Sequence, residues 1–198
     1  MKKILHTVLQ LSFTEYIQTW SGLINEFYQQ TVCDESLSKA LEIDHHNQLR
    51  FSLEVATVLV MIAVMSLDAK PKLVTGKTRE KLVEKLVDES YGTMVAGENK
   101  ELREMCKAFY QTKYQMFSGV CKNLSSDKEE RRRSDLIGFA RYVVAQVSGR
   151  REEDNTVALK ELGVILCTAS EAFMHLLNNS QQDTGKWNGT CNFTVYKD

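Results

Sequence analysis

The segment Leu49–Leu67, LRFSLEVATVLVMIAVMSL, constrains the fold of this 198-residue chain more than any other stretch. From Val55 to Leu67 it contains no charged residue, and only Thr57 and Ser66 interrupt the apolar run. A membrane-spanning helix needs about 20 apolar residues. The uncharged part, residues 55–67, is shorter than that, so its length argues against a membrane span.

A buried strand is the second interpretation of this segment, since many of its residues are β-branched. Apolar strands usually extend over about 4–8 residues, whereas the apolar character here continues from Leu49 through about five helical turns. The length therefore favours a helix. Because its apolar residues cover every side, this helix needs neighbours all around it.

The remaining chain supplies those neighbours as helices. It contains one proline and ten glycines, so little interrupts long helices, within which each proline would cost about 3 kcal/mol. We expect an all-α fold, a single-domain bundle of six or seven helices around the buried central helix. The bundle takes residues 1–178, and a short extended C-terminal tail takes residues 179–198.

Apolar residues recur at helical spacing through most of this bundle. In the first helix the stripe includes Leu9, Phe13, Tyr16 and Trp20, and we expect Trp20 to be its largest buried anchor. Ser126 and Glu129 have the spacing of a capping box, which predicts the start of a helix. The expected helices cover residues 3–30, 35–44, 46–67, 78–96, 98–124, 126–148 and 156–178.

The tail has a different character from the bundle. Asn188-Gly189 is a turn signal, and beyond it apolar and polar residues alternate, which predicts an extended segment. Trp187 and Phe193 are the large apolar side chains of this tail. We expect them to anchor it on the bundle or on a partner.

The helix expected over residues 98–124 has two distinct faces. One face carries Arg103, Lys107, Tyr110 and Tyr114. That face can pack within the bundle, or bind a protein partner, because tyrosine and arginine are enriched at interfaces. It can also bind nucleic acid, with bases stacked on the tyrosines. The other face is the expected core stripe, formed by Leu102, Met105, Phe109, Met116, Val120 and Leu124.

A run of basic residues, Arg131–Arg133, extends the nucleic-acid hypothesis. Asp127, Glu129 and Glu130 precede these arginines by three or four residues, which is typical of a solvated helix start with local ion pairs. The chain as a whole has 25 basic and 26 acidic residues, so its net charge does not attract nucleic acid. The candidate nucleic-acid residues are Lys100, Arg103, Lys107, Tyr110, Tyr114, Arg131, Arg132 and Arg133.

Two further motifs are incomplete. Glu42 and His45 have the spacing of a di-iron carboxylate bundle, but a second Glu-x-x-His is missing from the sequence. Gly76-Lys77-Thr78 resembles the end of a phosphate-binding loop, but Pro71 stands where that loop requires glycine. We therefore expect no cofactor and keep a metal-dependent helical-bundle enzyme only as an alternative.

These features together predict a non-enzymatic protein-interaction or assembly subunit, with a protein partner or self-association. The expected partner-binding residues are Arg103, Lys107, Tyr110, Tyr114, Trp187 and Phe193. The five cysteines form no CxxC pair, and the N-terminal residues are too polar for a signal peptide. We therefore expect a cytoplasmic protein that is not bound to a membrane.

Overall fold

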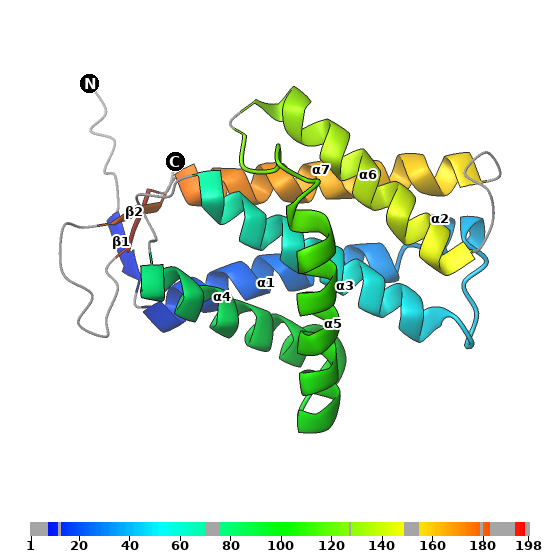
Figure 1. The fold of residues 1–198 in the computed structure, drawn as a ribbon, viewed down its shortest axis with the longest axis horizontal. Coiled ribbons are helices and arrows are strands. Elements are labelled where there is room, and N and C mark those ends of the chain that lie inside the picture. The colour runs from blue at the N-terminus through cyan, green and yellow to red at the C-terminus, as the bar shows by residue number, and fades with distance from the viewer. Residues whose placement is uncertain are drawn as a thin grey trace, which may run out of the picture.

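The computed structural model describes residues 8–11, 13–69, 76–126, 128–148, 155–178, 180–182 and 193–196. These residues form an all-α bundle with a small three-stranded sheet at one end (Figure 1). In chain order the elements are β1 (Val8–Leu11), α1 (Phe13–Val32), α2 (Glu35–Ala40), α3 (Gln48–Ser66), the 3-10 turn η1 (Leu67–Ala69), α4 (Gly76–Tyr91), the π-helical turn η2 (Gly92–Ala96), α5 (Lys100–Ser118), α6 (Glu129–Ser148), α7 (Thr156–Asn178), β2 (Ser180–Gln182) and β3 (Phe193–Tyr196).

Helix α3 is the centre of the bundle, as the apolar run predicts. It contacts α1, α4, α5, α6 and α7, and every residue from Val55 to Leu67 is buried. The two polar residues in this stretch are satisfied locally. The Thr57 hydroxyl donates to the Leu53 carbonyl oxygen at 2.7 Å, and the Ser66 hydroxyl donates to that of Ile62 at 2.8 Å.

The length argument against a membrane span was wrong. The helical segment Gln48–Ala69 is long and apolar enough to cross a membrane by length and composition alone. However, 83% of its most apolar window is buried by the protein itself. That burial is typical of a core helix, whose side chains already have neighbours on all sides.

Helix α1 packs along α3 and α7 through the predicted stripe. Trp20 is buried, and its ring stacks on Phe173 of α7 with centroids 5.6 Å apart, which confirms Trp20 as an anchor. The predicted start of this helix was wrong. It begins at Phe13, because Leu9 belongs to strand β1.

The predicted tail is extended where the structure describes it, in β2 and β3, and β3 pairs with the N-terminal strand β1. β3 lies between β1 and β2 and is antiparallel to both, with Leu11 and Gln182 each opposite Phe193. Strand β3 therefore has a hydrogen-bonding neighbour on each of its two edges. Trp187 lies outside the described residues.

Several other predicted boundaries were wrong. Helix α5 ends at Ser118 and not at residue 124. Helix α2 ends at Ala40 and not at residue 44, since a turn follows in which Glu42 has a φ of 53°. Helix α6 begins at Glu129. The Ser126 hydroxyl accepts from the backbone N–H of Lys128 at 3.2 Å, a tighter turn than the Glu129 contact of a capping box.

Candidate functional site: the two faces of helix α5

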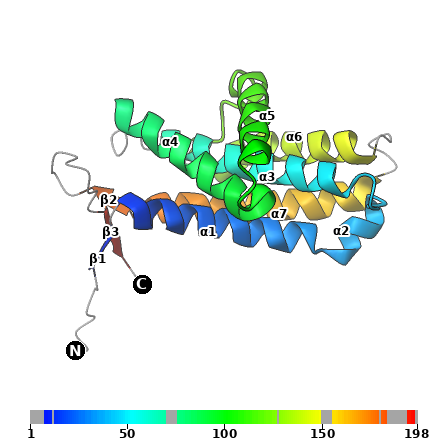
Figure 2. The ribbon, with the colours of Figure 1, turned by 90° about the horizontal axis from the view of Figure 1, so that it is seen from below.

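Helix α5 lies across the direction of the other long helices. Figure 2 shows it on the side of α3 away from α1 and α7, and in Figure 1 its N-terminal half extends beyond α4. The Asn99 side chain caps the helix by accepting from the Leu102 N–H at 3.0 Å. Because α5 lies on one side of α3 and extends beyond α4, only one side of this helix packs against the bundle.

The face that packs against the bundle is the tyrosine face, in agreement with the first of the three alternatives considered for it. Tyr110 is 5% exposed and Cys106 is also buried, while Tyr114 and Phe117 are partly buried against the core. The Phe117 ring lies 4.9 Å from the rings of Phe139 and Tyr142 in α6. Tyr110 is thus part of the core and presents no open stacking surface.

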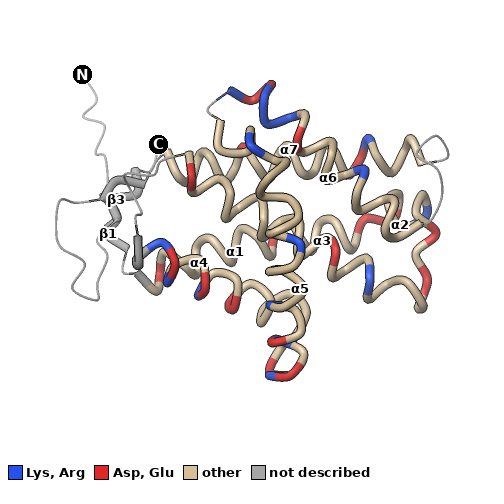
Figure 3. Tube along the Cα trace, viewed as in Figure 1, with Lys and Arg blue, Asp and Glu red and all other residues tan. Residues whose placement is uncertain are grey.

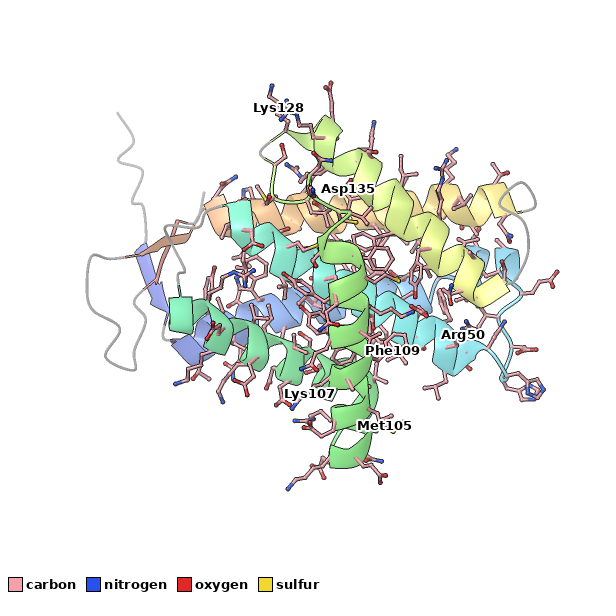
Figure 4. The ribbon with its side chains drawn as sticks, viewed as in Figure 1. Arg50, Met105, Lys107, Phe109, Lys128 and Asp135 are labelled. Atoms are coloured by element: carbon pink, nitrogen blue, oxygen red, sulfur yellow. The ribbon has the colours of Figure 1, made fainter. Side chains whose placement is uncertain are left out.

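The predicted core stripe mostly faces outward instead. Met105 is 63% exposed, Met116 is 50% exposed and Val120, in the turn after α5, is 74% exposed. Of the six residues expected in the core, only Leu124 is fully buried, and Leu102 and Phe109 are intermediate. Figure 4 shows Met105 and Phe109 on the side of α5 opposite to Lys107.

Arg103 and Lys107 are engaged by an acidic residue of α4. The Asp88 carboxylate lies 2.5 Å from the Lys107 ammonium and 3.5 Å from the Arg103 guanidinium. The hydrogen bond from Lys107 lowers the pKa of Asp88, and the same bond raises the pKa of Lys107. These cations hold α5 on α4 and are not available as free charges for a phosphate backbone.

Arg103 also closes the connection between α4 and α5. Its guanidinium donates to the Gly97 carbonyl oxygen at 2.6 Å and lies against Gly92, where an added Cβ would come 2.7 Å from a guanidinium nitrogen. Gly97 has a φ of 54° and a ψ of −130°, a conformation that is essentially restricted to glycine. The two glycines therefore allow the turn to fold tightly around Arg103.

A buried carboxylate lies behind α5, and the sequence did not reveal it. Glu54 of α3 is 3% exposed, and its carboxylate lies 3.8 Å from the Lys113 ammonium. The Tyr142 hydroxyl donates to Glu54 Oε1 at 3.3 Å and accepts a hydrogen bond from Lys113. Burial raises the pKa of Glu54, partly offset by the positive charge of Lys113.

Lys113 is enclosed by rings as well as by hydrogen-bonding groups. Its ammonium lies 4.8 Å from the ring centroid of Phe109 and 4.9 Å from that of Tyr142. An ammonium at this distance from aromatic faces gains cation–π stabilisation. The cluster connects α3, α5 and α6, and a structural role accounts for its contacts.

The Arg131–Arg133 run does not join the basic residues of α5. Arg132 is buried and donates to the Ser126 carbonyl oxygen at 2.6 Å, while Arg133 lies 4.0 Å from Glu129. Figure 3 shows the basic residues at the start of α6 and those at the start of α5 near opposite ends of α5. This distance and the burial of Tyr110 mean that the candidate nucleic-acid residues do not form one surface. Among the candidate residues on α5, only Lys100 is exposed without a described ion pair.

The half motif for a metal site does not assemble a centre either. Glu42 and His45 lie in the turn before α3, not on a helix as a di-iron site requires. Among the described residues, no group of three or more His, Cys, Asp or Glu side chains could hold a metal ion.

The functional hypotheses depend on these contacts alone. No family model matches the chain, and no curated protein or solved structure is significantly similar to it.

Proposed function

We propose that this protein is a non-enzymatic assembly subunit that binds a second copy of itself through the outward face of α5. The observation that carries the proposal is the apolar stripe formed by Met105, Phe109, Met116 and Val120. The side chains of Met105, Met116 and Val120 are each at least half exposed. A helix with apolar residues on both its inner and its outer side is typical of a bundle that packs against a further element.

The side chains of this stripe suit a protein interface. Methionine is flexible and polarisable, so it adapts well to a partner surface. Together with Phe109 it provides the aromatic and methionine content that is enriched at interface centres. Arg103 and Lys107 are paired with Asp88 of α4 on the other side of the helix. Lys113 is paired with the buried Glu54, and its ammonium lies against the Phe109 ring, 4.8 Å from the ring centroid.

The spacing of the stripe favours a two-fold arrangement. Its positions, 105, 109, 112, 116 and 120, are nearly symmetric about Thr112. Two copies of α5 packed antiparallel about that point would place Met105 opposite Val120 and Phe109 opposite Met116. No charged residue lies on this stripe, so the pairing brings no like charges together. A self-complementary patch of this kind is what a closed dimer requires.

Sedimentation equilibrium of the full chain under reducing conditions tests the proposal; the reductant is needed because Cys33 is an exposed thiol. We expect the wild-type protein to be a dimer and the double variant Met105→Ser, Met116→Ser to be a monomer. The matched control is Val157→Ser, Val164→Ser on α7, where the side chains are 57% and 60% exposed.

The control should leave the dimer intact, because it removes similar exposed apolar area from a different helix. Circular dichroism should show that both double variants keep the fold, since exposed substitutions change stability by only about 0.5 kcal/mol each. A wild-type protein that is monomeric at every concentration, or equal loss of the dimer in both double variants, would refute the proposal.

A further inference from the structure

A groove between α6 and α7 lies apart from the outward face of α5. The two helices lie side by side and run in opposite directions (Figure 1). The groove has a volume of about 510 Å³, and Ile137 of α6 and Val164 of α7, which line it, are 40% and 60% exposed. Gly163 also lines it, and a Cβ added there would have no neighbour within 4 Å. No other described part of this chain therefore fills the space above Gly163.

The charged residues that line this groove are mostly basic. Arg133, Arg141 and Lys160 line it together with a single acidic residue, Glu171. This excess of positive charge is local, because the whole chain has 25 basic and 26 acidic residues. Burial raises the pKa of the Cys167 thiol, which also lines the groove, so this thiol stays neutral and adds no negative charge. The groove therefore favours an acidic occupant.

Two of these cations can accept a carboxylate from outside. Lys160 is exposed and has no ion pair among the described residues. The Arg133 side chain is 64% exposed, and its described ion pair, with Glu129 of the same helix, has a length of 4.0 Å. An exposed pair of this kind contributes little to stability, so a carboxylate from a partner can compete with Glu129.

The spacing of the basic residues matches that of a helix. Arg133 and Arg141 are two helical turns apart on α6, about 12 Å along its axis. Lys160 lies toward the Arg141 end of the groove, because α7 starts where α6 ends. A partner helix with acidic residues two turns apart and apolar residues between them has the same spacing. Binding of an amphipathic helix in an apolar groove is a recurring mode of recognition.

We propose that the groove between α6 and α7 binds an acidic amphipathic helix of a partner protein. The apolar side chains of that helix contact Ile137 and Val164. Its carboxylates pair with Arg133 at one end and with Arg141 and Lys160 at the other. Nucleic acid is a poorer occupant, because none of the described residues that line the groove is aromatic and bases would have no stacking surface. The groove contains no residue of α5, so the inference does not depend on dimer formation.

Fluorescence anisotropy with two labelled synthetic peptides of about 15 residues tests the proposal. Both peptides carry leucines at helical spacing, and the residues beside the leucines are glutamates in one peptide and glutamines in the other. Glutamate and glutamine have similar helix propensities, so the peptides differ mainly in charge. We expect the glutamate peptide to bind about tenfold more tightly, the combined effect of several exposed ion pairs. Added salt should reduce this preference, because it screens such pairs.

A pair of double variants tests the charges of the groove. Arg133→Gln, Lys160→Gln should remove most of the preference for the glutamate peptide. The matched control, Lys100→Gln, Arg131→Gln, removes the same types of charge at exposed positions outside the groove and should keep the preference. All four positions are exposed, so both proteins should fold, which circular dichroism can check.

A second pair of variants tests the apolar part of the groove. Ile137→Ser, Val164→Ser should weaken the binding of both peptides. Met105→Ser, Met116→Ser removes exposed apolar side chains of α5 instead and should bind both peptides as the wild type does. This last protein also distinguishes the two proposals, because it should lose the dimer and keep the peptide site.

Equal affinities of the two peptides for the wild type, or no binding of either, would overturn the proposal. So would a preference for glutamate that survives Arg133→Gln, Lys160→Gln, or one that the control variant loses to the same extent. Competition experiments cover the other anionic surfaces. If a single-stranded oligonucleotide or phosphatidylserine vesicles displace the glutamate peptide at lower concentration than the unlabelled peptide does, the groove is a site for nucleic acid or membrane and the proposal fails.

Discussion

The Lys113 ammonium of α5 lies 3.8 Å from the carboxylate of Glu54, which α3 carries into the centre of the bundle. Tyr142 of α6 bridges the two, so a single ion pair connects three helices. A buried pair of this kind contributes little beyond an apolar substitute, but the removal of one partner leaves an uncompensated charge in the core.

Lys113→Met should therefore destabilise the protein by about 3 kcal/mol, measured by urea denaturation. The change keeps the length and apolar character of the side chain but leaves Glu54 without its cation. The double variant Glu54→Leu, Lys113→Met should recover most of the loss, because it removes both charges. Similar stability of Lys113→Met and the wild type would show that the pair does not hold α5 on α3.

Glu54 should give the protein a specific dependence on pH. Because burial raises its pKa above the ordinary carboxyl value, the folded state binds the proton more tightly than the unfolded state. Its stabilising effect is complete below the unfolded pKa, and it is lost as the pH rises through the folded pKa. The free energy of unfolding of the wild type, relative to Glu54→Gln, should thus fall as the pH increases across that window.

The difference between the two proteins is the quantity to measure, since other carboxylates act in the opposite direction. Asp88, whose pKa is lowered, stabilises the fold above its unfolded pKa, and this contribution disappears as the pH falls through the folded pKa. That contribution is common to both proteins and cancels. A difference that stays constant with pH would contradict the assigned direction.

Gly97→Ala should destabilise the fold by about 1–3 kcal/mol, because its φ of 54° with a ψ of −130° strains any other residue. The strain would also disturb the carbonyl oxygen that accepts from Arg103. Gly22→Ala is the matched control. Gly22 is exposed in the interior of α1, with open space around the added Cβ, so alanine should stabilise the protein by about 0.5–1 kcal/mol. Thermal unfolding of both variants checks the opposite signs.

The central helix could be predicted from the sequence because a helix that is buried on all sides consists almost entirely of apolar residues. The run from Val55 to Leu67 contains almost nothing that water would stabilise. The bounds of α7, residues 156–178, could also be predicted from the sequence, since a charged connector precedes this helix and a polar stretch follows it. Periodicity and local breaks are properties of neighbouring residues, and a single sequence displays them.

The faces of α5 could not be assigned in the same way. Both its faces repeat at helical spacing, and the more apolar stripe, with Met105 and Met116, was taken for the core. The choice depends on residues far away in the chain. Asp88 neutralises Lys107, and Glu54 neutralises Lys113, so a face that carries cations can be the packed one. Such long-range compensation has no local pattern.

Strand β3 lies between β1 and β2, so the first described strand of the chain receives its only described neighbour from the last. On the ribosome, β1 emerges before helices α1 to α7, and its partner β3 is made after these helices. The helices can therefore begin to pack while β1 is still without its partner. The sheet can therefore close only after helices α1 to α7 have been synthesised.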